Sequence, residues 1–222
     1  MERRIDEARA GATHEHKDPL LFAGFQSIQL CDVGFSYAAL GSFDPFSVGP
    51  INLGIRRGET LFIVGGNGSG KTTLLKLIAG LYEPRSGIIC VEDVLATQSL
   101  RPLYRSLFAG VFSDFLLFNR LYGVGTVNLA TASDLLTRMG ISHKVKIVEG
   151  CFSTLDLSIG QRKRLALIAS LLEDRLVYIF DEWTADQNPH FREEFYGNRS
   201  DRIVKLDYGQ IVSVERNQSP PG

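Results

Sequence analysis

The sequence is poor in cysteine, carries almost no net charge and has no long uninterrupted hydrophobic run. Its three cysteines, Cys31, Cys90 and Cys151, stand far apart and fit neither a disulfide framework nor a metal-ligand spacing, so we expect a reduced, cytosolic protein. The formal net charge of −1 gives no support for a nucleic-acid-binding surface, and no nucleic-acid partner is expected.

Membrane-spanning and targeting segments are not expected either. No uncharged hydrophobic run reaches the ~18 residues that span a bilayer, and Met1-Glu-Arg-Arg is followed by no signal-peptide core. A membrane-embedded partner stays compatible with such a chain. Residues 1–24 are expected to be a polar linker or extension, because the segment up to Pro19 is charged, mixed in sign and offers no face to bury. With 222 residues, 44% of them hydrophobic, the rest suits one α/β domain.

The most informative stretch runs from Gly65 to Thr73 and reads Gly-Gly-Asn-Gly-Ser-Gly-Lys-Thr-Thr, which fits the phosphate-binding pattern G-x-x-x-x-G-K-[ST] in full. A β-prone run precedes it and helically spaced leucines follow it, as the pattern requires. The glycines allow successive backbone N–H groups to turn toward one phosphate, and the helix adds its positive dipole end. Lys71 is predicted to reach the β- and γ-phosphates, and the Thr72 hydroxyl to bind Mg²⁺. An accidental glycine-rich turn is the alternative, but the flanks favour a nucleoside-triphosphate site.

Strand-like alternation is found on both sides of this stretch. The segments 28–35 and 46–55 predict two strands joined as a hairpin, and 87–91 predicts a further strand. Tyr37 stands at the end of the first strand. An aromatic ring there can stack on a nucleotide base or simply pack in the sheet, and the pattern alone does not decide between the two.

The middle of the chain predicts a mainly helical insertion over about 116–156. Residues 107–117 are largely apolar, and from Asn119 to Met139 the pattern turns helical. The expected core positions of that helical part are Leu129, Leu135, Leu136 and Met139.

The next stretch predicts a helix with a capped start. Ser158 and Gln161 form the pattern S-x-x-Q of a capping box, and apolar residues recur along one face behind them. A helix N-terminus that exposes a serine and a glycine is suited to bind an anion, although an ordinary capped helix shows the same pattern.

Five apolar residues, Leu176 to Phe180, then lead directly to Asp181 and Glu182. This order is typical of a buried parallel strand that delivers acidic side chains to the ligand-binding end of an α/β sheet. Asp181 is predicted to hold Mg²⁺, and Glu182 to polarise the attacking water. The alternative is a strand that ends in an ordinary surface turn. The phosphate loop and the capped helix that precede it in the sequence disfavour this alternative.

Together these stretches resemble ATP-binding cassette ATPase domains, in which they correspond to Walker A, the signature (157–161) and Walker B (176–182). The order and separations match from about Ile28 to Gln210, with Asp186 as the D-loop acid. The resemblance implies ATP and Mg²⁺ as ligands, and an α/β P-loop NTPase fold with a parallel core sheet, an antiparallel β subdomain and a helical insertion. By the same resemblance, Glu182 and Lys71 act in hydrolysis, Thr72 and Asp181 hold the metal, and Tyr37 stacks on the base. The implied nucleotide-binding residues are Tyr37, Gly65, Asn67, Gly68, Ser69, Gly70, Lys71, Thr72, Thr73, Ser158, Gly160 and Gln161.

Three short segments resemble the corresponding segments of the bacterial exporters of cyclic peptides and siderophore peptides. They are Phe46-Ser-Val-Gly-Pro, Val111-Phe-Ser-Asp-Phe and Phe180-Asp-Glu-Trp-Thr-Ala-Asp-Gln. In those proteins the ATPase domain follows a six-helix membrane domain, so the resemblance implies a transmembrane partner, fused or separate, that handles the peptide. It also implies a head-to-tail homodimer on ATP binding and a location at the cytoplasmic face of the bacterial inner membrane. The expected ATPase domain covers 25–215, with a helical subdomain at about 116–172 and a flexible tail at 216–222.

Two departures from the family pattern stand out. Ser113 occupies the position of a common glutamine, a substitution that this subfamily often shares. More seriously, the strand that normally carries a switch histidine is missing between Tyr196 and Asp201, and His190 is not its equivalent. Three outcomes are open: Ile203-Val-Lys-Leu fills the place in the sheet, the two halves of the sheet close up, or the domain is only marginally stable. Because that run is the only β-prone one nearby, we predict that it pairs with the strand at 61–64.

Three functions therefore remain open at the level of sequence. The first is the ATPase motor of a peptide exporter, and the second is a degenerate cassette that binds ATP but hydrolyses it poorly. The third is a soluble cassette ATPase of repair or translation, which the exporter-like sequence segments disfavour.

Overall fold

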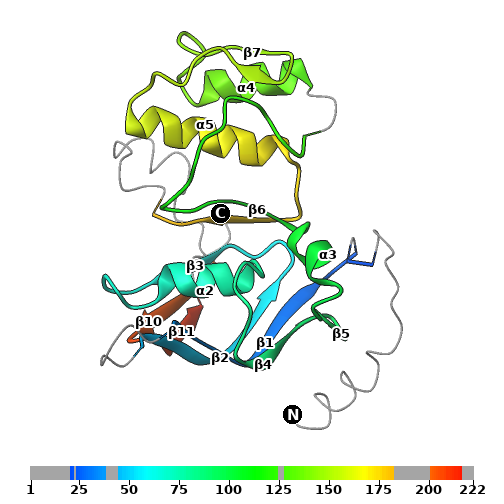
Figure 1. Cartoon of the computed structure of the whole chain (residues 1–222), viewed down its shortest axis with the longest axis vertical. Coiled ribbons are helices and arrows are strands. Elements are labelled where there is room, and N and C mark those ends of the chain that lie inside the picture. The colour runs from blue at the N-terminus through cyan, green and yellow to red at the C-terminus, as the bar shows by residue number, and fades with distance from the viewer. Residues whose placement is uncertain (1–20, 23, 39–44, 125–127, 183–200, 217–222) are drawn as a thin grey trace. The chain divides into compact units, whose positions relative to one another are not determined.

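The computed structural model describes residues 21–22, 24–38, 45–124, 128–182 and 201–216 (Figure 1). They belong to two compact units: unit 1 comprises the chain up to Leu107 and from Tyr196 onward, and unit 2 runs from Phe108 to Phe195. Most of the expected N-terminal extension and C-terminal tail lies outside the described residues, as do Asp186 and His190.

The described residues of unit 1 form two sheets and two helices. A four-stranded antiparallel sheet has the order β2-β1-β4-β5, and a three-stranded sheet has the order β11-β10-β3. The elements are β1 (Ser27–Ser36), β2 (Ser47–Arg56), β3 (Leu61–Val64), α2 (Lys71–Ile78), β4 (Ser86–Val91), β5 (Val94–Leu95), α3 (Arg101–Arg105), β10 (Arg202–Asp207) and β11 (Gln210–Arg216).

The expected antiparallel pair at 28–35 and 46–55 is confirmed by β1 and β2. Ile28 pairs with Ile55 and Leu30 with Leu53, so the apolar residues that alternate along β1 reach the core. Ile28 and Leu30 are buried, as this alternation requires. The strand expected at 87–91 is β4, which pairs with the other side of β1.

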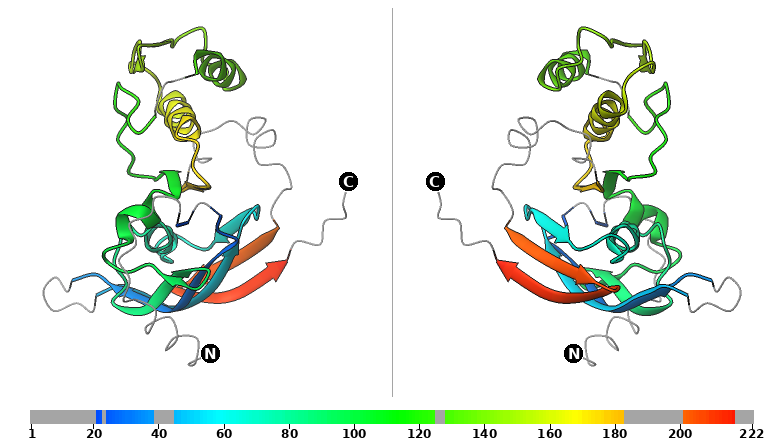
Figure 2. Two further views of the ribbon diagram at one scale, coloured as in Figure 1. Left: turned by 90° about the vertical axis from the view of Figure 1, so that its right-hand side faces the viewer. Right: turned by 90° about the vertical axis from the view of Figure 1, so that its left-hand side faces the viewer.

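The predicted pairing of Ile203–Leu206 with the phosphate-loop strand is also confirmed. β10 runs parallel to β3, with Ile203 opposite Phe62 and Val204 opposite Ile63 (Figure 2). Its other side pairs with β11 in an antiparallel hairpin. Val204 and Leu206 are completely buried, which explains why this short apolar run is held in the sheet. No strand of the described residues carries a histidine.

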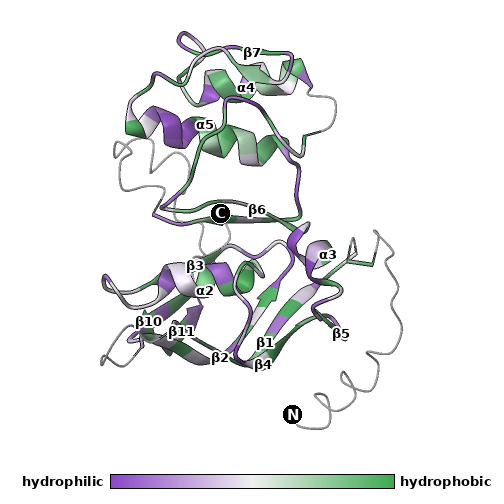
Figure 3. Cartoon of the chain, in the orientation of Figure 1, coloured by the Kyte–Doolittle hydropathy of each residue, from purple (hydrophilic) through white to green (hydrophobic). Residues whose placement is uncertain are grey.

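In the described part of unit 2 there are a parallel strand pair, a short β-hairpin and two helices. Its elements are β6 (Phe108–Val111), α4 (Leu129–Arg138), β7 (Ile147–Val148), β8 (Cys151–Phe152), α5 (Ile159–Leu172) and β9 (Val177–Phe180). β6 and β9 run parallel, so the strand expected before Asp181 is present and parallel. Only Ile179 of its four residues is fully buried. Figure 3 shows a hydrophilic stretch of α5 between hydrophobic ones. The helix buries Leu165 to Ile168, and also the polar residues Lys163 and Ser170.

The helical interpretation of 119–139 was wrong for its first part. Asn119 to Val124 is not helical, because its backbone pairs with the β7–β8 hairpin: the Phe152 amide donates to the Asn119 carbonyl at 2.7 Å. The helix begins only at Leu129, where the Asn128 side chain accepts hydrogen bonds from the backbone amides of Ala130 and Thr131.

Burial in α4 also differs in part from expectation. Leu136 and Met139 are buried, as expected, whereas Leu129 at the start of the helix is 63% exposed. Helical spacing predicts which face of a helix is apolar, but not which of its turns pack against another element. In α4 the first turn leaves its leucine exposed to solvent. Across the described residues, no helix combines the length and hydrophobicity needed to cross a bilayer.

Candidate functional site

The phosphate loop lies between β3 and α2 in unit 1. Gly70, the residue before α2, has a φ of 99°, a left-handed conformation that favours glycine. At Gly65 a side chain would collide with the Leu206 carbonyl and the Ser69 hydroxyl. The loop therefore follows a path that larger residues at these two positions would disturb.

Lys71, the first residue of α2, folds back over this loop. Its ammonium donates to the carbonyl oxygens of Gly65 at 3.0 Å and Gly66 at 2.9 Å. The segment Gly66–Gly68 is exposed, so this face of the loop is accessible from solvent. The cation is thus held at the surface where a phosphate is expected to bind.

The polar groups of the loop fit a phosphate ligand. The Ser69 hydroxyl is buried and has no hydrogen-bond partner among the described residues, although buried polar atoms normally have one. The first helical hydrogen bond of α2 runs from the Leu74 amide to the Gly70 carbonyl, so the first-turn amides point out of the helix end. A helix N-terminus of this kind attracts anions.

The turn of the β10–β11 hairpin is hydrogen-bonded to the phosphate loop. The Gly209 amide in its turn donates to the Ser69 carbonyl at 2.9 Å, and the Gly49 amide of β2 donates to the Gly209 carbonyl at 2.8 Å. The phosphate loop is therefore bonded to a segment more than a hundred residues away in the sequence.

Tyr37 lies beside the start of α2. Its hydroxyl is 2.9 Å from the Thr73 hydroxyl, and its ring stands nearly perpendicular to those of Phe35 and Tyr82, with centroids 5.1 and 6.0 Å away. The ring is 41% exposed. The structure thus brings Tyr37 to the phosphate loop, where it can present a face to a base.

In unit 2, Asp181 follows β9 and is 4% exposed. Its amide donates to the Val111 carbonyl at 2.9 Å, and the Ser113 hydroxyl donates to its carboxylate at 3.1 Å. Sequence reasoning noted Ser113 only as a departure from the family pattern and missed this contact. A carboxylate and a threonine hydroxyl are the oxygen ligands that Mg²⁺ prefers, so Asp181 and Thr72 fit the metal chemically.

Glu182 comes next and has a left-handed backbone, with a φ of 48°. Its carbonyl accepts a hydrogen bond from the ammonium of Lys163 in α5 at 3.1 Å. Lys163, only 7% exposed, was also missed. The signal that was available is its spacing, because it lies four residues before the buried Leu167 and so on the buried face of α5.

The capping box at the start of α5 is confirmed. The Ser158 hydroxyl accepts from the Gln161 amide at 3.4 Å, and the Gln161 side chain accepts from the Ser158 amide at 3.2 Å. Ile159, between the expected nucleotide contacts Ser158 and Gly160, is 59% exposed. This helix end is therefore accessible to a ligand.

The expected site residues fall into two groups that the structure describes separately. Tyr37 and the whole of Gly65–Thr73 belong to unit 1, whereas the signature residues, Asp181 and Glu182 belong to unit 2. Within the described residues, no three histidine, cysteine or acidic side chains form a metal-type cluster.

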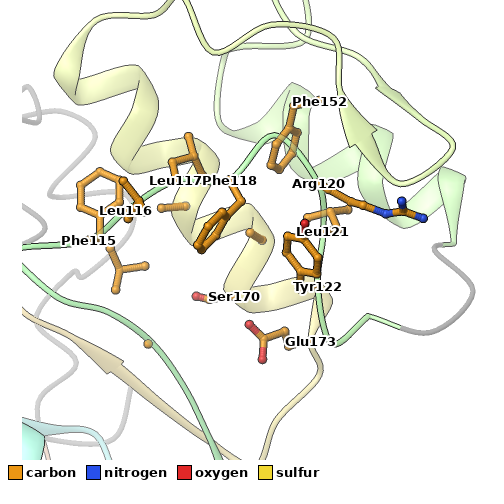
Figure 4. Close-up of a pocket in the computed structure, with 14 residues that line it drawn as sticks. Phe115, Leu116, Leu117, Phe118, Arg120, Leu121, Tyr122, Phe152, Ser170 and Glu173 are labelled. Atoms are coloured by element: carbon orange, nitrogen blue, oxygen red, sulfur yellow. The ribbon is translucent and has the colours of Figure 1, made fainter.

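Unit 2 also has an apolar groove of about 490 Å³ beside α5 (Figure 4). Leu116, Phe118 and Tyr122 on the segment that runs along the helix are 75%, 55% and 64% exposed. Ser170 of α5 contributes a buried hydroxyl that has no partner in the described part of the chain. So much exposed apolar surface is typical of an interaction site.

Comparison with known proteins identifies similar sequences. A family model described as "ABC transporter" matches residues 48–185. The ATP-binding protein SyrD of Pseudomonas syringae pv. syringae is 47% identical over 214 residues, covering 84% of this chain and 38% of that protein. The mycobactin import ATP-binding/permease protein IrtB of Mycolicibacterium thermoresistibile is 33% identical over 174 residues, covering 72% of this chain and 29% of that protein.

A solved structure agrees with the fold. It is that of a bacterial Atm1-family ABC exporter with ATP bound, with a TM-score of 0.74 at 20% identity, covering 87% of this chain and 39% of that one. The chain thus spans less than two fifths of the length of these proteins. The 214-residue alignment with SyrD is longer than 84% of a 222-residue chain, so SyrD has residues without a counterpart here.

Proposed function

The chain belongs to the ABC transporter family, and from this premise we propose that it is the nucleotide-binding domain that powers an exporter of cyclic or siderophore-type peptides. The observation that carries the proposal is the phosphate loop, in which Lys71 is held over exposed backbone and the Ser69 hydroxyl is buried without a partner among the described residues. The proposed substrate class, a peptide, rests on the sequence segments that resemble the peptide-exporter subfamily.

Nucleotide binding divides among residues of unit 1. Tyr37 stacks on the adenine, the amides of Gly68 to Thr73 surround the phosphates, and Lys71 exchanges its carbonyl partners for the β- and γ-phosphates. Mg²⁺ held by Thr72 and Asp181 would neutralise charge on the same phosphates.

For hydrolysis, Glu182 is the proposed general base. It accepts a proton from water, whose oxygen bonds to the γ-phosphorus while the bond to the β–γ bridging oxygen breaks. ADP leaves with that electron pair, and inorganic phosphate is the second product. The Glu182 side chain is exposed, so it is accessible to the attacking water.

Two partner surfaces follow from unit 2. The exposed start of α5, with Ser158, Gly160 and Gln161, would close over the nucleotide of a second copy in a head-to-tail dimer. The apolar groove along α5 would receive a segment of the transmembrane partner, fused or separate. The domain would then lie at the cytoplasmic face of the bacterial inner membrane.

A second candidate is a degenerate cassette that binds ATP and dimerises but turns over poorly. It is supported by the absence of a histidine-bearing strand from the described residues. A soluble cassette ATPase is disfavoured because several similar proteins are named export or permease proteins. A membrane domain encoded in the same or an adjacent reading frame would separate the exporter from the soluble ATPase.

Calorimetry and steady-state ATP turnover test the proposal. Lys71→Ala should weaken Mg-ATP binding at least about tenfold, because charge-assisted bonds contribute roughly 1.5–3 kcal/mol each. Glu182→Gln should keep ATP affinity, lose hydrolysis and accumulate an ATP-bound dimer in gel filtration. Glu149→Gln is the matched control, since Glu149 is also exposed and has a φ of 50°. Binding without turnover in the parent chain would favour the degenerate cassette, and unchanged affinity in Lys71→Ala would contradict the phosphate-loop assignment.

A further inference from the structure

We propose that Lys163 is a positioning residue for hydrolysis, which holds the backbone that carries Glu182 and couples it to the start of α5. The inference rests on the proposed function, in which Glu182 is the base. Its starting observation is the hydrogen bond of 3.1 Å from the Lys163 ammonium to the Glu182 carbonyl.

The burial of Lys163 makes this contact unusual. A lysine that is 7% exposed has left water with its charge, which is costly unless acceptors compensate it. Lys163 lies on the face of α5 that also buries Leu167 and Ser170, where an apolar residue would be the ordinary choice. A cation at this place therefore calls for a specific role, and the carbonyl that it reaches belongs to the proposed base.

The backbone at Glu182 is of a kind that needs support. Its φ of 48° is uncommon for a residue with a side chain, and such conformations persist where the surroundings hold them. Lys163 holds the carbonyl on the buried side, while the Glu182 side chain is exposed on the other. The direction in which the carboxylate points is set by this backbone, since only two side-chain torsions before the carboxylate remain free.

The same lysine connects two motifs. Lys163 lies five residues after Ser158, within one rigid helix whose exposed start is proposed to contact the partner's nucleotide. A shift of that helix end moves the ammonium and, through the hydrogen bond, the Glu182 backbone. The contact thus provides a direct route by which closure of the dimer adjusts the base in the same chain.

Substitutions separate positioning from simple packing. Lys163→Met keeps length and loses the donor, Lys163→Arg keeps a donor, and Lys144→Met removes an exposed lysine of unit 2 as the control. In Lys163→Met we expect kcat to fall at least about tenfold, as misplaced catalytic groups do. The Kd for Mg-ATP should stay within about twofold. The thermal midpoint should change little, because removal of a buried charge offsets the loss of its hydrogen bond. Lys163→Arg should recover most of kcat.

Hydrogen exchange provides a readout that does not depend on turnover. In Lys163→Met, the backbone amides of 177–182 should exchange faster, while those of 61–75 stay unchanged. If the parent chain does not hydrolyse ATP, the proposed hydrolysis fails but this contact is still tested. Unaltered exchange, or a kcat that falls only in proportion to ATP affinity and thermal stability, would overturn the positioning role.

Discussion

At the scale of single residues, contacts with nearby backbone and rings hold the proposed ligand-binding groups in place. Lys71 is held by two loop carbonyls, and Tyr37 by the Thr73 hydroxyl and two perpendicular aromatic rings. These side chains are exposed or half-buried and contribute little to the core. Their loss is therefore expected to affect binding more than folding.

Tyr37→Ala should weaken ATP binding by about tenfold, because stacking of a base on an aromatic ring contributes roughly 1–3 kcal/mol. Binding of inorganic tripolyphosphate, which has no base, should not change. Tyr208→Ala is the control, since Tyr208 is 87% exposed. Calorimetry with both ligands checks the prediction, and an equal loss for tripolyphosphate would show that Tyr37 supports the loop rather than the base.

Cys90 should be the slowest of the three cysteines to react with iodoacetamide at pH 8. Burial, and to a lesser extent the neighbouring Cys31 and Asp93, raise the pKa of its thiol to about 11. The reactive thiolate is thus scarce at pH 8, and reactivity should rise only as the pH approaches that pKa. Cys31 and Cys151 are half-buried and serve as internal references in mass spectrometry. Faster labelling of Cys90 than of both would contradict the burial.

At the scale of elements, β10 is the strand on which the phosphate loop depends. Its first four residues, Arg202 to Lys205, pair with the whole of β3, and the Leu206 carbonyl lies against Gly65. Its turn to β11 is bonded to the Ser69 carbonyl. A perturbation of β10 is therefore expected to reach the nucleotide site without touching a ligand-binding side chain.

Leu206→Ala should lower the free energy of unfolding by about 2–5 kcal/mol, the usual cost of truncating a buried leucine. Leu206 is fully buried, whereas Lys205 beside it is exposed, so Lys205→Ala is the matched control. Urea unfolding followed by circular dichroism measures both variants. Equal, small effects of the two substitutions would mean that β10 is not anchored in the core as described.

At the scale of the whole molecule, the proposed site residues are shared between two compact units. The phosphate loop lies in unit 1, and the signature, Asp181 and Glu182 lie in unit 2. In the proposed mechanism, binding of the phosphates would therefore depend mainly on unit 1, and hydrolysis on groups from both units. The chain as a whole should gain stability from nucleotide even if turnover is slow.

Mg-ATP at a hundred times its Kd should stabilise the folded chain by about 2.7 kcal/mol, because the ligand binds only the folded state. The thermal midpoint should rise accordingly in scanning calorimetry. Lys71→Ala, at the same ATP concentration, should show a much smaller rise. If Mg-ATP does not change the thermal midpoint of the unsubstituted chain, nucleotide binding itself is contradicted.

Patterns of residues close together in the sequence were sufficient to predict many of the structural features of this protein. The phosphate loop with its flanking strand and helix, the β1–β2 hairpin and the capping box at Ser158 each depend on residues within a few positions of one another. The pairing of β10 with β3 could also be predicted, because one β-prone run was available for one place in the sheet.

Contacts between segments that are distant in the sequence become known only from the folded chain. The bond from Lys163 to Glu182, the bond from Ser113 to Asp181 and the support of Ser69 by Gly209 join residues 19, 68 and 140 positions apart. No local pattern encodes such distances. The same reason explains the error at Asn119–Val124: its helical spacing was real, but pairing with the β7–β8 hairpin satisfied its backbone better than a helix. Local sequence predicts which groups bind a nucleotide, whereas packing sets which contacts hold those groups in place.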